Sequence, residues 1–449
     1  MSDHTAPAAG SVGSPAPIAP RKVLLAAFAS TFGWALDLFD LFLLLYVAPI
    51  VGKLFFPATT PTLSLAAVYA SFAVALLVRP LGSAIFGAYA DRKGRKLALM
   101  VAMVGVGLAT AGFGLLPTIH QVGILAPILF LLLRVVQGLF VGGIVASTHT
   151  IGTESIPPQY RGLVSGLVGG AGAGIGALMA SFAYFVLSGI FPDAEFDKWG
   201  WRFMFFTGLI STVFGLIMFK FLEESPVWKQ LQAAKASGKV ASAPRISPVR
   251  RLFGPEYRKV MFVNLLITFG GGATYYLTSG YLPTLLNLVA KVPHGESSRI
   301  LMWGSVAVIV SSLLFGWLSD KLGRKPSFIA AGLAALIGLP LLFNAMTGAA
   351  GNVDAVLWYA IAISLIGGAA IAPIMIFLNE RFATDIRASG TGLSWNIGFA
   401  LGGTMPTFVS LAAATPEQIP MVLAIFGGTL GLVYLIGAVV IPETRGRTL

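Results

Sequence analysis

"GAYADRKGRK" (Gly87–Lys96) returns 229 residues later as "GWLSDKLGRK" (Gly316–Lys325). A second pair keeps nearly the same offset. "ESIPPQYRG" (Glu154–Gly162) is echoed 226 residues later by "ERFATDIRASG" (Glu380–Gly390), and in both copies the arginine stands seven positions after the acid. Two matches at nearly one offset indicate an internal repeat. The chain is therefore predicted to consist of two halves built to one plan.

The composition is that of a membrane protein. Of the 449 residues, 56% are hydrophobic and 11% are charged, whereas a soluble protein carries roughly twice that charged fraction. Apolar stretches long enough to cross a bilayer as a helix recur along the chain. A large soluble helical core is disfavoured because these stretches lack polar helix faces. The sequence predicts an all-α polytopic membrane protein.

Twelve transmembrane helices are expected, in two pseudo-symmetric six-helix halves. We predict a disordered cytoplasmic tail over 1–22, a bundle over 23–221, a cytoplasmic linker over 222–258, and a second bundle with a short tail over 259–449. The expected spans are 23–50, 63–90, 97–117, 124–150, 162–190, 200–221, 259–284, 299–319, 326–347, 355–380, 388–413 and 419–441.

Positive charge concentrates on one side of the expected bilayer. Of the 30 Lys and Arg residues, 23 lie on the side of the termini, five on the opposite side and two at membrane depth. Since basic loops stay in the cytoplasm, both termini should be cytoplasmic in a multi-pass protein of the inner (plasma) membrane. The net charge of +12 is thus largely a topology signal. The sequence predicts contact with the lipid bilayer and no nucleic-acid partner.

Residue types exclude several kinds of site. The chain has no cysteine, so it has no disulfide, thiolate metal site or cysteine nucleophile. Its four histidines are scattered and none has the i, i+4 partner of a helical metal site. No nucleotide-binding loop or nucleophile with an adjacent base is visible. We expect neither an enzyme nor a cofactor, and a monomer.

Four charged residues stand at membrane depth in the first half. "GWALDLFDLF" (Gly33–Phe42) holds Asp37 and Asp40, each costing ~2.5–3.5 kcal/mol at the centre of a membrane helix. Their i, i+3 spacing places them on one helix face. Counted from the helix ends, Arg79 and Arg134 lie at a similar depth of ~15–18 Å. The four charges cancel, so the arginines can neutralise the carboxylates.

Several stretches resemble one transporter superfamily. The doubled G-x-x-x-D-[RK]-x-G-R-K resembles the signature of the major facilitator superfamily, and "RVVQGLFVGG" (Arg134–Gly143) resembles its fourth-helix motif. Four stretches look more narrowly like its metabolite:proton symporters: "LFFP" (Leu54–Pro57), "RPLGSAIFGAYADRKGRK" (Arg79–Lys96), "WGWRF" (Trp199–Phe203) and "EESPVW" (Glu223–Trp228). Three also resemble the sialate and lactate symporters: "ALDLFD" (Ala35–Asp40), "ERFATDIRASGTGLSWNIG" (Glu380–Gly398) and "PETRG" (Pro442–Gly446).

The resemblance implies a carrier that opens alternately to the two sides, is driven by the proton gradient and has coupling groups in helices one and four. It assigns Arg134 to coupling with Asp37 and Asp40. One aspartate should exchange the proton while Arg134 keeps the other ionised. Arg79 is left as the substrate anchor, because its planar fork can grip a carboxylate. In the alternative reading the network only fixes helix register, and Arg79 balances an aspartate and braces helix two against helix one.

The second half is neutral at the same depth. Tyr275 and Tyr276 are expected to line the substrate cavity, since tyrosine offers an apolar face and a hydroxyl. Trp395 and Asn396 in "SWNIG" are expected to line it as well. Ordinary helix packing is the alternative for all four.

The repeated motifs predict a cytoplasmic gate. Each copy ends a helix beside a basic cluster, and pairing between such loops and neighbouring helices would close the cytoplasmic side. The alternative is a solvated set of topology signals. The predicted gate residues are Asp91, Arg92, Arg95, Asp320, Arg324, Glu154, Arg161, Glu380 and Arg387.

The function expected from the sequence is secondary active import of a small organic anion, a carboxylate, together with a proton. A first alternative is proton-coupled uptake of a zwitterion such as an amino acid or betaine, in which the carboxylates would hold the cationic end. A second is an uncoupled facilitator or channel, which the buried aspartate pair argues against.

Overall fold

The computed structural model describes residues 20–154, 158–221, 248–349, 351–383 and 386–446. At several helix ends, residues 20–30, 87–88, 90–92, 95 and 145–154 among them, it describes the backbone alone. Within the described ranges the secondary structure is helical, without strands. Each of the twelve expected spans coincides with a helix or with consecutive helical pieces.

The first half contains six spans, of which three are built from several helical pieces. In order the pieces are α1 (Pro20–Tyr46), α2 (Ala48–Phe55), α3 (Pro61–Lys93), α4 (Arg95–Leu115), α5 (Ile119–Val122), α6 (Leu125–Glu154), η1 (Pro158–Tyr160), α7 (Arg161–Ser165), η2 (Gly166–Ala171), α8 (Gly172–Ile190), α9 (Asp193–Glu195), η3 (Phe196–Gly200), α10 (Trp201–Phe206) and α11 (Leu209–Phe221).

The second half also contains six spans, broken at different places. Its pieces are α13 (Pro248–Leu252), α14 (Arg258–Tyr275), η4 (Tyr276–Gly280), α15 (Leu282–Thr284), η5 (Leu285–Val289), α16 (His294–Leu322), α17 (Arg324–Leu333), η6 (Ala334–Gly338), α18 (Leu339–Gly348), α19 (Val353–Ile371), α20 (Ile374–Asn379), α21 (Arg387–Gly403), α22 (Met405–Ala412), η7 (Pro416–Gln418) and α23 (Ile419–Val440).

Proline positions explain why two spans are broken. Ten described helices are each long and apolar enough to cross a membrane, and the pair Thr31–Tyr46 and Ala48–Phe55, bent by 61°, makes an eleventh. The remaining expected span, 388–413, consists of α21 and α22 and breaks at Thr404, just before Pro406. Proline cannot continue the hydrogen-bond ladder of the preceding turn, so α2 and α22 each restart with proline near their first position.

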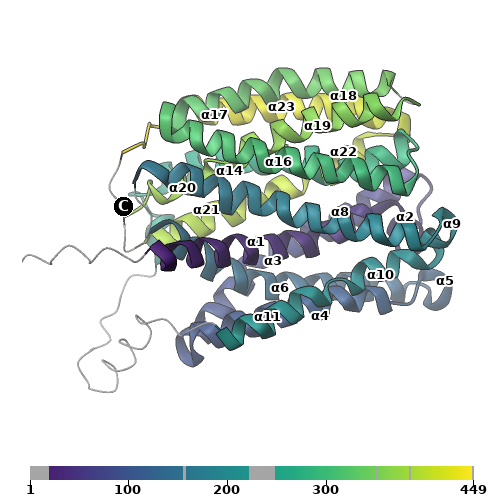
Figure 1. Cartoon of the computed structure of the whole chain (residues 1–449), viewed down its shortest axis with the longest axis horizontal. Coiled ribbons are helices and arrows are strands. Elements are labelled where there is room, and N and C mark those ends of the chain that lie inside the picture. The colour runs from purple at the N-terminus through teal and green to yellow at the C-terminus, as the bar shows by residue number, and fades with distance from the viewer. Residues whose placement is uncertain (1–19, 155–157, 222–247, 350, 384–385, 447–449) are drawn as a thin grey trace, which may run out of the picture.

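The helices run side by side along the long axis of the molecule, with α4, α6 and α11 at the bottom of Figure 1 and α17, α18 and α23 at the top. The halves meet where α16 packs on α7, η2 and α8, and where α3 packs on α21 and α22. Small residues permit the first contact: a Cβ on Gly166 would collide with the carbonyl oxygen of Ser312. Such close backbone approach is typical of packing in membranes.

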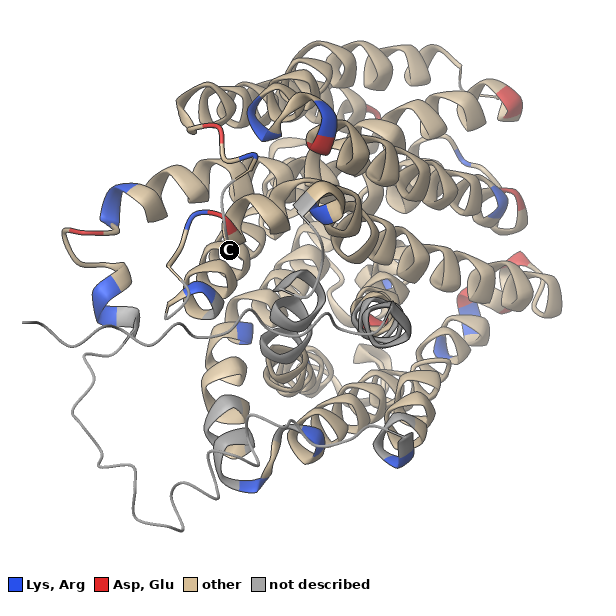
Figure 2. Cartoon of the chain, turned by 60° about the vertical axis from the view of Figure 1, so that its left-hand side comes forward, with Lys and Arg blue, Asp and Glu red and all other residues tan. Residues whose placement is uncertain are grey.

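Charge and apolar surface separate along the molecule. Figure 2 shows most coloured, charged residues near helix ends and loops, with long tan stretches between them. Large apolar side chains face outward between the ends, including Leu81, Phe182, Phe262, Trp303 and Leu341. This apolar belt is what a lipid-facing surface requires.

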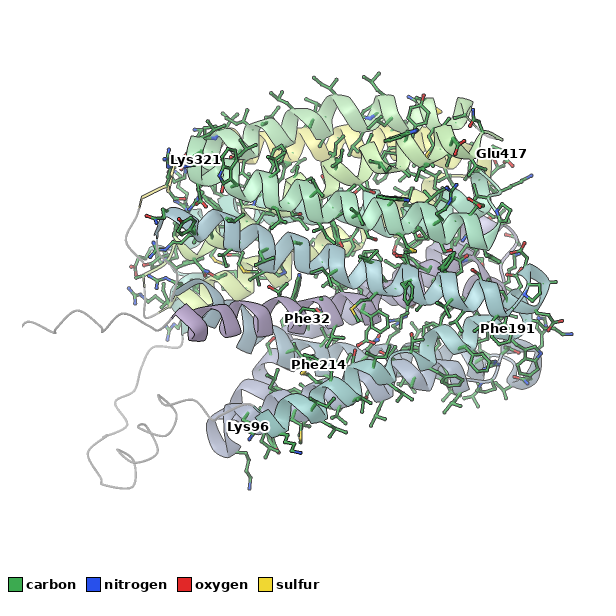
Figure 3. The ribbon with its side chains drawn as sticks, viewed as in Figure 1. Phe32, Lys96, Phe191, Phe214, Lys321 and Glu417 are labelled. Carbon is green, nitrogen blue, oxygen red and sulfur yellow. The ribbon has the colours of Figure 1, made fainter. Side chains whose placement is uncertain are left out.

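The two ends are distinguished by residues labelled in Figure 3. Lys96 and Lys321 lie at one end, and Phe191 and Glu417 lie at the other. We call these the Lys321 end and the Glu417 end. The basic loops predicted to be cytoplasmic belong to the Lys321 end. Along the bundle between the two ends, Phe32 of α1 stacks on Phe214 of α11 with ring centroids 6.5 Å apart.

Candidate functional site

A buried ion pair joins α1 to α3. Arg79 donates from Nη1 to Asp37 Oδ2 and from Nη2 to Asp37 Oδ1, both at 3.2 Å. The residues are 5% and 1% exposed. Two parallel bonds from a planar guanidinium to a carboxylate are a strong and directional arrangement. The structure therefore brings together two of the four charged residues that the sequence placed at one depth.

Asp40 lies in different surroundings. It is 2% exposed, and neither carboxylate oxygen has a hydrogen-bond partner among the described residues. The hydroxyl groups of Ser211 and Thr110 lie near it, on α11 and α4. An uncompensated charge at such a place would be costly. Asp40 can therefore gain or release a proton without breaking an ion pair.

Arg134 completes a polar network beside Asp40. It is fully buried, donates to Gln137 Oε1 at 2.5 Å and lies 4.4 Å from the ring centre of Phe113. Gln137 in turn donates from Nε2 to the Thr110 hydroxyl at 2.8 Å. Arg134 thus reaches the surroundings of Asp40 through Gln137 and Thr110.

These contacts differ from the pairing expected between Arg134 and an aspartate. Among the described residues Arg134 makes no ion pair with Asp37 or Asp40; Asp37 pairs with Arg79 instead. The reason is rotational, since residues i and i+3 differ by about 60° around a helix. Asp37 points toward α3, whereas Asp40 points toward α4 and α11. The pairing fits the alternative in which Arg79 balances an aspartate.

Aromatic side chains of both halves meet beside the ion pair. We call them the aromatic wall: Trp34, Phe42, Phe72, Tyr275, Tyr276, Trp395 and Phe399. Trp395 and Phe399 of α21 stack with centroids 4.1 Å apart, and Trp34 of α1 meets Trp395 edge-on at 5.7 Å. Tyr276 contacts both Phe72 and Phe399. The charges of Arg79 and Asp37 both act on Tyr276, which places the wall next to the ion pair.

Two further predicted cavity residues are buried in this region. The Tyr275 hydroxyl is buried and has no hydrogen-bond partner in the described part of the chain, although its ring packs edge-on against Phe42 at 6.1 Å. Asn396 follows Trp395 on α21 and is 8% exposed. An unpartnered buried hydroxyl is costly, and a bound ligand could satisfy it.

Sequence reasoning missed part of this site. Phe399 and Phe72 carried no signal, because an aromatic residue in an apolar helix is ordinary. Gln137 was findable: it stands one turn after Arg134 in "RVVQG", and an amide at membrane depth needs a partner.

At the Lys321 end, Asp320 connects the two halves. Its carboxylate accepts the backbone N–H groups of Gly162 and Leu163, each at 2.8 Å. Arg324 donates to Asp320 at 2.8 Å and forms a second ion pair with Glu380 at 3.0 Å. These pairs are almost fully buried. The structure thus assembles three predicted gate residues against the first half.

The remaining predicted gate residues are placed differently. Arg161 lies near enough to Glu380, Arg324 and Arg387 to be affected by their charges. Arg387 donates to the carbonyl oxygen of Asn379 at 3.2 Å. The side chains of the other four lie outside the described residues: Asp91, Arg92, Arg95 and Glu154.

Glu443 caps the start of α17 at the same end. It accepts the backbone N–H groups of Arg324, Lys325, Thr444 and Arg445 at 2.8–3.0 Å. Burial disfavours its charged form, but these hydrogen bonds outweigh burial and lower the pKa of Glu443. A carboxylate at a helix N-terminus also faces the favourable end of the helix dipole.

The halves also touch at the Glu417 end. Tyr69 of α3 stacks on Tyr281 with centroids 4.9 Å apart and hydrogen-bonds to Thr284 at 2.8 Å. His294 of α16 pairs with Asp197 of η3 at 3.2 Å. Contacts at both ends leave the ion pair and the aromatic wall enclosed between them.

Known proteins are similar to this chain over nearly its whole length. The family model described as "Major Facilitator Superfamily" matches residues 23–405. The inner membrane metabolite transport protein YhjE of Escherichia coli (strain K12) is 31% identical over 441 residues, covering 96% of this chain and 97% of that protein. The proline/betaine transporter of the same strain is 29% identical over 437 residues, covering 95% and 85%.

A solved structure shows the same fold. The xylose transporter XylE of Escherichia coli, in a partially occluded inward-open conformation, superposes with a TM-score of 0.71 at 18% identity. The match covers 95% of this chain and 99% of that one. The expected twelve-helix architecture in two halves is confirmed.

Proposed function

The chain belongs to the major facilitator superfamily and is a multi-pass membrane transporter, not an enzyme, and from this premise we propose that it imports a small zwitterion together with a proton. The observation that carries the proposal is the buried Arg79–Asp37 pair beside the aromatic wall. The similarity to proline/betaine transporters supports a zwitterion better than the small organic anion expected from the sequence.

A zwitterion matches this site because it carries one charge of each sign. Its carboxylate can take the fork of Arg79, while its cationic end meets Asp37 and the ring faces of Tyr276 and Phe399. Aromatic faces attract quaternary and other ammonium groups. Leaving one member of a buried ion pair without its partner costs ~3–5 kcal/mol. A zwitterion avoids this cost because it gives Arg79 and Asp37 each a new partner of opposite charge.

An organic anion is the second candidate, and the same arginine supports it. A carboxylate bound to Arg79 would deprive Asp37 of its counter-charge, so Asp37 would have to carry the proton. The two candidates therefore assign the coupled proton to different residues. With a zwitterion, the proton falls to Asp40, which has no counter-ion among the described residues and lies next to the Arg134–Gln137–Thr110 network.

The orientation follows from charge. We place the Lys321 end and both termini in the cytoplasm, because 23 of the 30 Lys and Arg residues belong to that side. The Glu417 end then faces outward from the inner (plasma) membrane. Proton-driven uptake enters from that end.

Transport by the purified protein in liposomes tests the proposal. Uptake of labelled glycine betaine, proline and lactate is measured with an inward proton gradient and again with a protonophore. We expect betaine or proline to accumulate above the outside concentration and the protonophore to abolish accumulation. Accumulation of lactate alone would establish the carboxylate reading. Equilibration without accumulation would identify an uncoupled facilitator.

A further inference from the structure

A cluster of polar side chains at the Glu417 end joins the halves and has no part in the central site. The imidazole of His294, at the start of α16, contacts the Tyr184 hydroxyl through Nδ1 at 2.5 Å and Asp197 through Nε2 at 3.2 Å. The backbone N–H of His294 donates to Asp193 at 3.3 Å. We call Tyr184, Asp193, Asp197, Asn287 and His294 the outer latch.

The latch is buried on one side and open on the other. Tyr184 is fully buried and packs against Tyr46 of α1. The His294 side chain is 15% exposed and that of Asp197 is 52% exposed. Since α9 lies at the outer tip of the molecule (Figure 1), a proton from outside can reach the imidazole without passing through the bundle.

The latch has a satisfied hydrogen-bond pattern around neutral His294. Nε2–H then donates to Asp197, and Nδ1 accepts from the Tyr184 hydroxyl. The Tyr184 oxygen accepts from Asn287 Nδ2 at 3.4 Å. Asn287 Oδ1 is buried without a hydrogen-bond partner among the described residues.

The same side chains can also satisfy protonated His294. Both ring nitrogens then donate, so Nδ1–H points at the Tyr184 oxygen and the tyrosine proton must turn away. A rotation of the Asn287 amide presents the unpartnered Oδ1 as the acceptor of that proton. Proton binding thus reverses two hydrogen bonds, His294–Tyr184 and Tyr184–Asn287, and keeps the histidine and tyrosine paired.

Two carboxylates of the first half lie at this histidine: Asp197 contacts the imidazole and Asp193 accepts its backbone N–H. Glu296 and Arg299 on α16 pair with each other at 2.7 Å. Three more charged residues on these segments make no hydrogen bond or ion pair with His294 in the described part of the chain: Glu195, Lys198 and Lys291.

We propose that His294 is a proton-binding site of the outer gate, and that its protonation from outside strengthens the bond to Asp197 and holds the outer side closed. Histidine is suited to this role because its charge changes between pH 5 and 8. Acid outside the cell then favours the closed outer gate. The proposal goes beyond the substrate assignment; it rests on alternating access, which the family membership implies, and on the orientation proposed above, with the Glu417 end facing outward.

A cysteine below the latch can report its closure. Ser279 lines a small cavity together with Ala177, Ser305 and Tyr46, whose ring packs on that of Tyr184 in the latch. The Ser279 hydroxyl has no hydrogen-bond partner within the described ranges. Because the chain has no native cysteine, Ser279→Cys is a single label site. Its reaction with a membrane-impermeant thiol reagent, added from outside without substrate, is measured between pH 5.5 and pH 8.

Thiol reactivity itself changes with pH, so the profile is compared with that of Ser279→Cys combined with His294→Gln. In both proteins the labelling rate is compared at pH 8 and pH 5.5. We expect the decrease towards pH 5.5 to be roughly three- to fivefold larger in Ser279→Cys alone than in the variant that also carries His294→Gln, which is the size expected for a partly exposed ion pair. His120→Gln is the matched control, because His120 is an exposed histidine at the same end and outside the latch. It should leave the difference unchanged.

The proposal would be overturned if the labelling profiles with pH were identical with and without His294. It would also be overturned if His120→Gln removed the pH dependence as His294→Gln does. If Ser279→Cys cannot be labelled at any pH, hydrogen exchange of segment 193–200 replaces it, corrected for intrinsic rates. Protection should increase at pH 5.5 in the unmodified protein and not in His294→Gln. Equal protection in both would reject the gate site, whatever the substrate proves to be.

Discussion

The two halves are built alike at their ends and differ in the middle. Both copies of the repeated motif turn at a glycine with positive φ, +103° at Gly94 and +112° at Gly323. At membrane depth, by contrast, the first half holds Asp37, Asp40, Arg79 and Arg134, while the described residues of the second half contribute neutral side chains, chiefly Tyr275, Tyr276, Trp395 and Phe399. The two halves thus share the motif turn, and the buried charges at membrane depth belong to the first half.

This division has a mechanical consequence. When the halves rock, contacts between them break and re-form in every cycle. An ion pair across that boundary would have to be desolvated each time, at several kcal/mol per ion. The Arg79–Asp37 pair lies within one half, between α1 and α3, so the motion of the halves does not by itself separate its two members. The aromatic wall crosses the boundary and carries no formal charge.

The largest effect is expected at Asp40. Asp40→Asn removes the carboxyl that has no counter-ion among the described residues, so accumulation against a gradient should be lost while downhill exchange of labelled substrate continues. Asp40→Glu, which keeps a titratable group, should retain some accumulation. Uptake and exchange in liposomes measure both. If Asp40→Asn still concentrates substrate and Asp37→Asn does not, the proton site is Asp37.

A nearly equal effect is expected at Arg79, on binding. Arg79→Lys keeps the charge but loses the bidentate fork, so the apparent KM should increase. Arg79→Ala leaves Asp37 as an unpaired buried charge, which costs ~3–5 kcal/mol and can unfold the protein.

The double variant Arg79→Gln with Asp37→Asn is the control that removes both charges together. It should fold, as shown by its elution and melting, and bind zwitterion at least about 30-fold more weakly, since truncating a buried charged contact costs ~2–5 kcal/mol. Calorimetry gives the affinity. Near-normal binding by the folded double variant would make the pair a structural brace between α1 and α3.

The spans and the depth of the charges were readable from the sequence, because hydrophobic length and rise per residue fix both. The repeat also singled out Asp320, which in the structure lies near the end of α16 and accepts backbone N–H groups at the start of α7; its role in a gate stays a prediction. The partner of each aspartate was not readable. Spacing of i, i+3 places two side chains on one broad helix face, but their directions still differ by about 60° around the helix axis. This difference is enough for Asp37 to pair with Arg79 while Asp40 lies near Thr110.

Other features had no sequence signal. The contact of Tyr184 with His294 joins residues 110 positions apart in two segments whose sequences match no motif. Phe399 was hidden in an apolar helix. The break at Val47, which bends the first span by 61°, could have been anticipated from Pro49, whereas the expectation was one unbroken span over 23–50.

The aromatic side of the comparison can be tested at Tyr276. Tyr276→Phe keeps the ring and should bind zwitterion almost normally. Tyr276→Leu keeps apolar bulk but loses the ring face, and should weaken binding of betaine by ~0.5–2 kcal/mol, the range of a cation–π contact. Competition binding measures both variants. Equal affinities for the two variants would show that the ring supplies packing alone.

The gate is tested by Asp320→Asn. The substituted amide would keep the shape of the side chain but lose the ion pair with Arg324 and one acceptor for the N–H groups of Gly162 and Leu163. Closure at the Lys321 end should weaken by ~1–2 kcal/mol. Gly169→Cys is a suitable reporter, because an added side chain there meets Met375 and Trp395 at ordinary distances.

In Gly169→Cys, labelling from the cytoplasmic side should become faster when Asp320→Asn is added. Asp91→Asn, the corresponding change in the first copy of the motif, should act in the same direction. Unchanged labelling in both would leave the repeated motif as a topology signal only.

The smallest effect is expected at Glu443, which caps the start of α17 directly after the turn at Gly323 in the second copy of the motif. Its pKa is lowered from 4.5 because the hydrogen bonds from Arg324, Lys325, Thr444 and Arg445 outweigh burial. A lowered pKa means that the charged form stabilises the fold above pH 4.5 and that this contribution is lost as pH falls through the folded-state pKa.

Glu443→Gln should therefore lower stability at pH 7 by ~0.5 kcal/mol, the low end for a helix cap that remains partly solvated. Thermal unfolding in detergent at pH 7 and again near pH 3 measures the difference between the two proteins. The difference should shrink at the lower pH, since more of the native glutamate is then protonated and a protonated glutamate resembles the amide. A difference that is the same at both values would mean that Glu443 acts through its shape and not its charge.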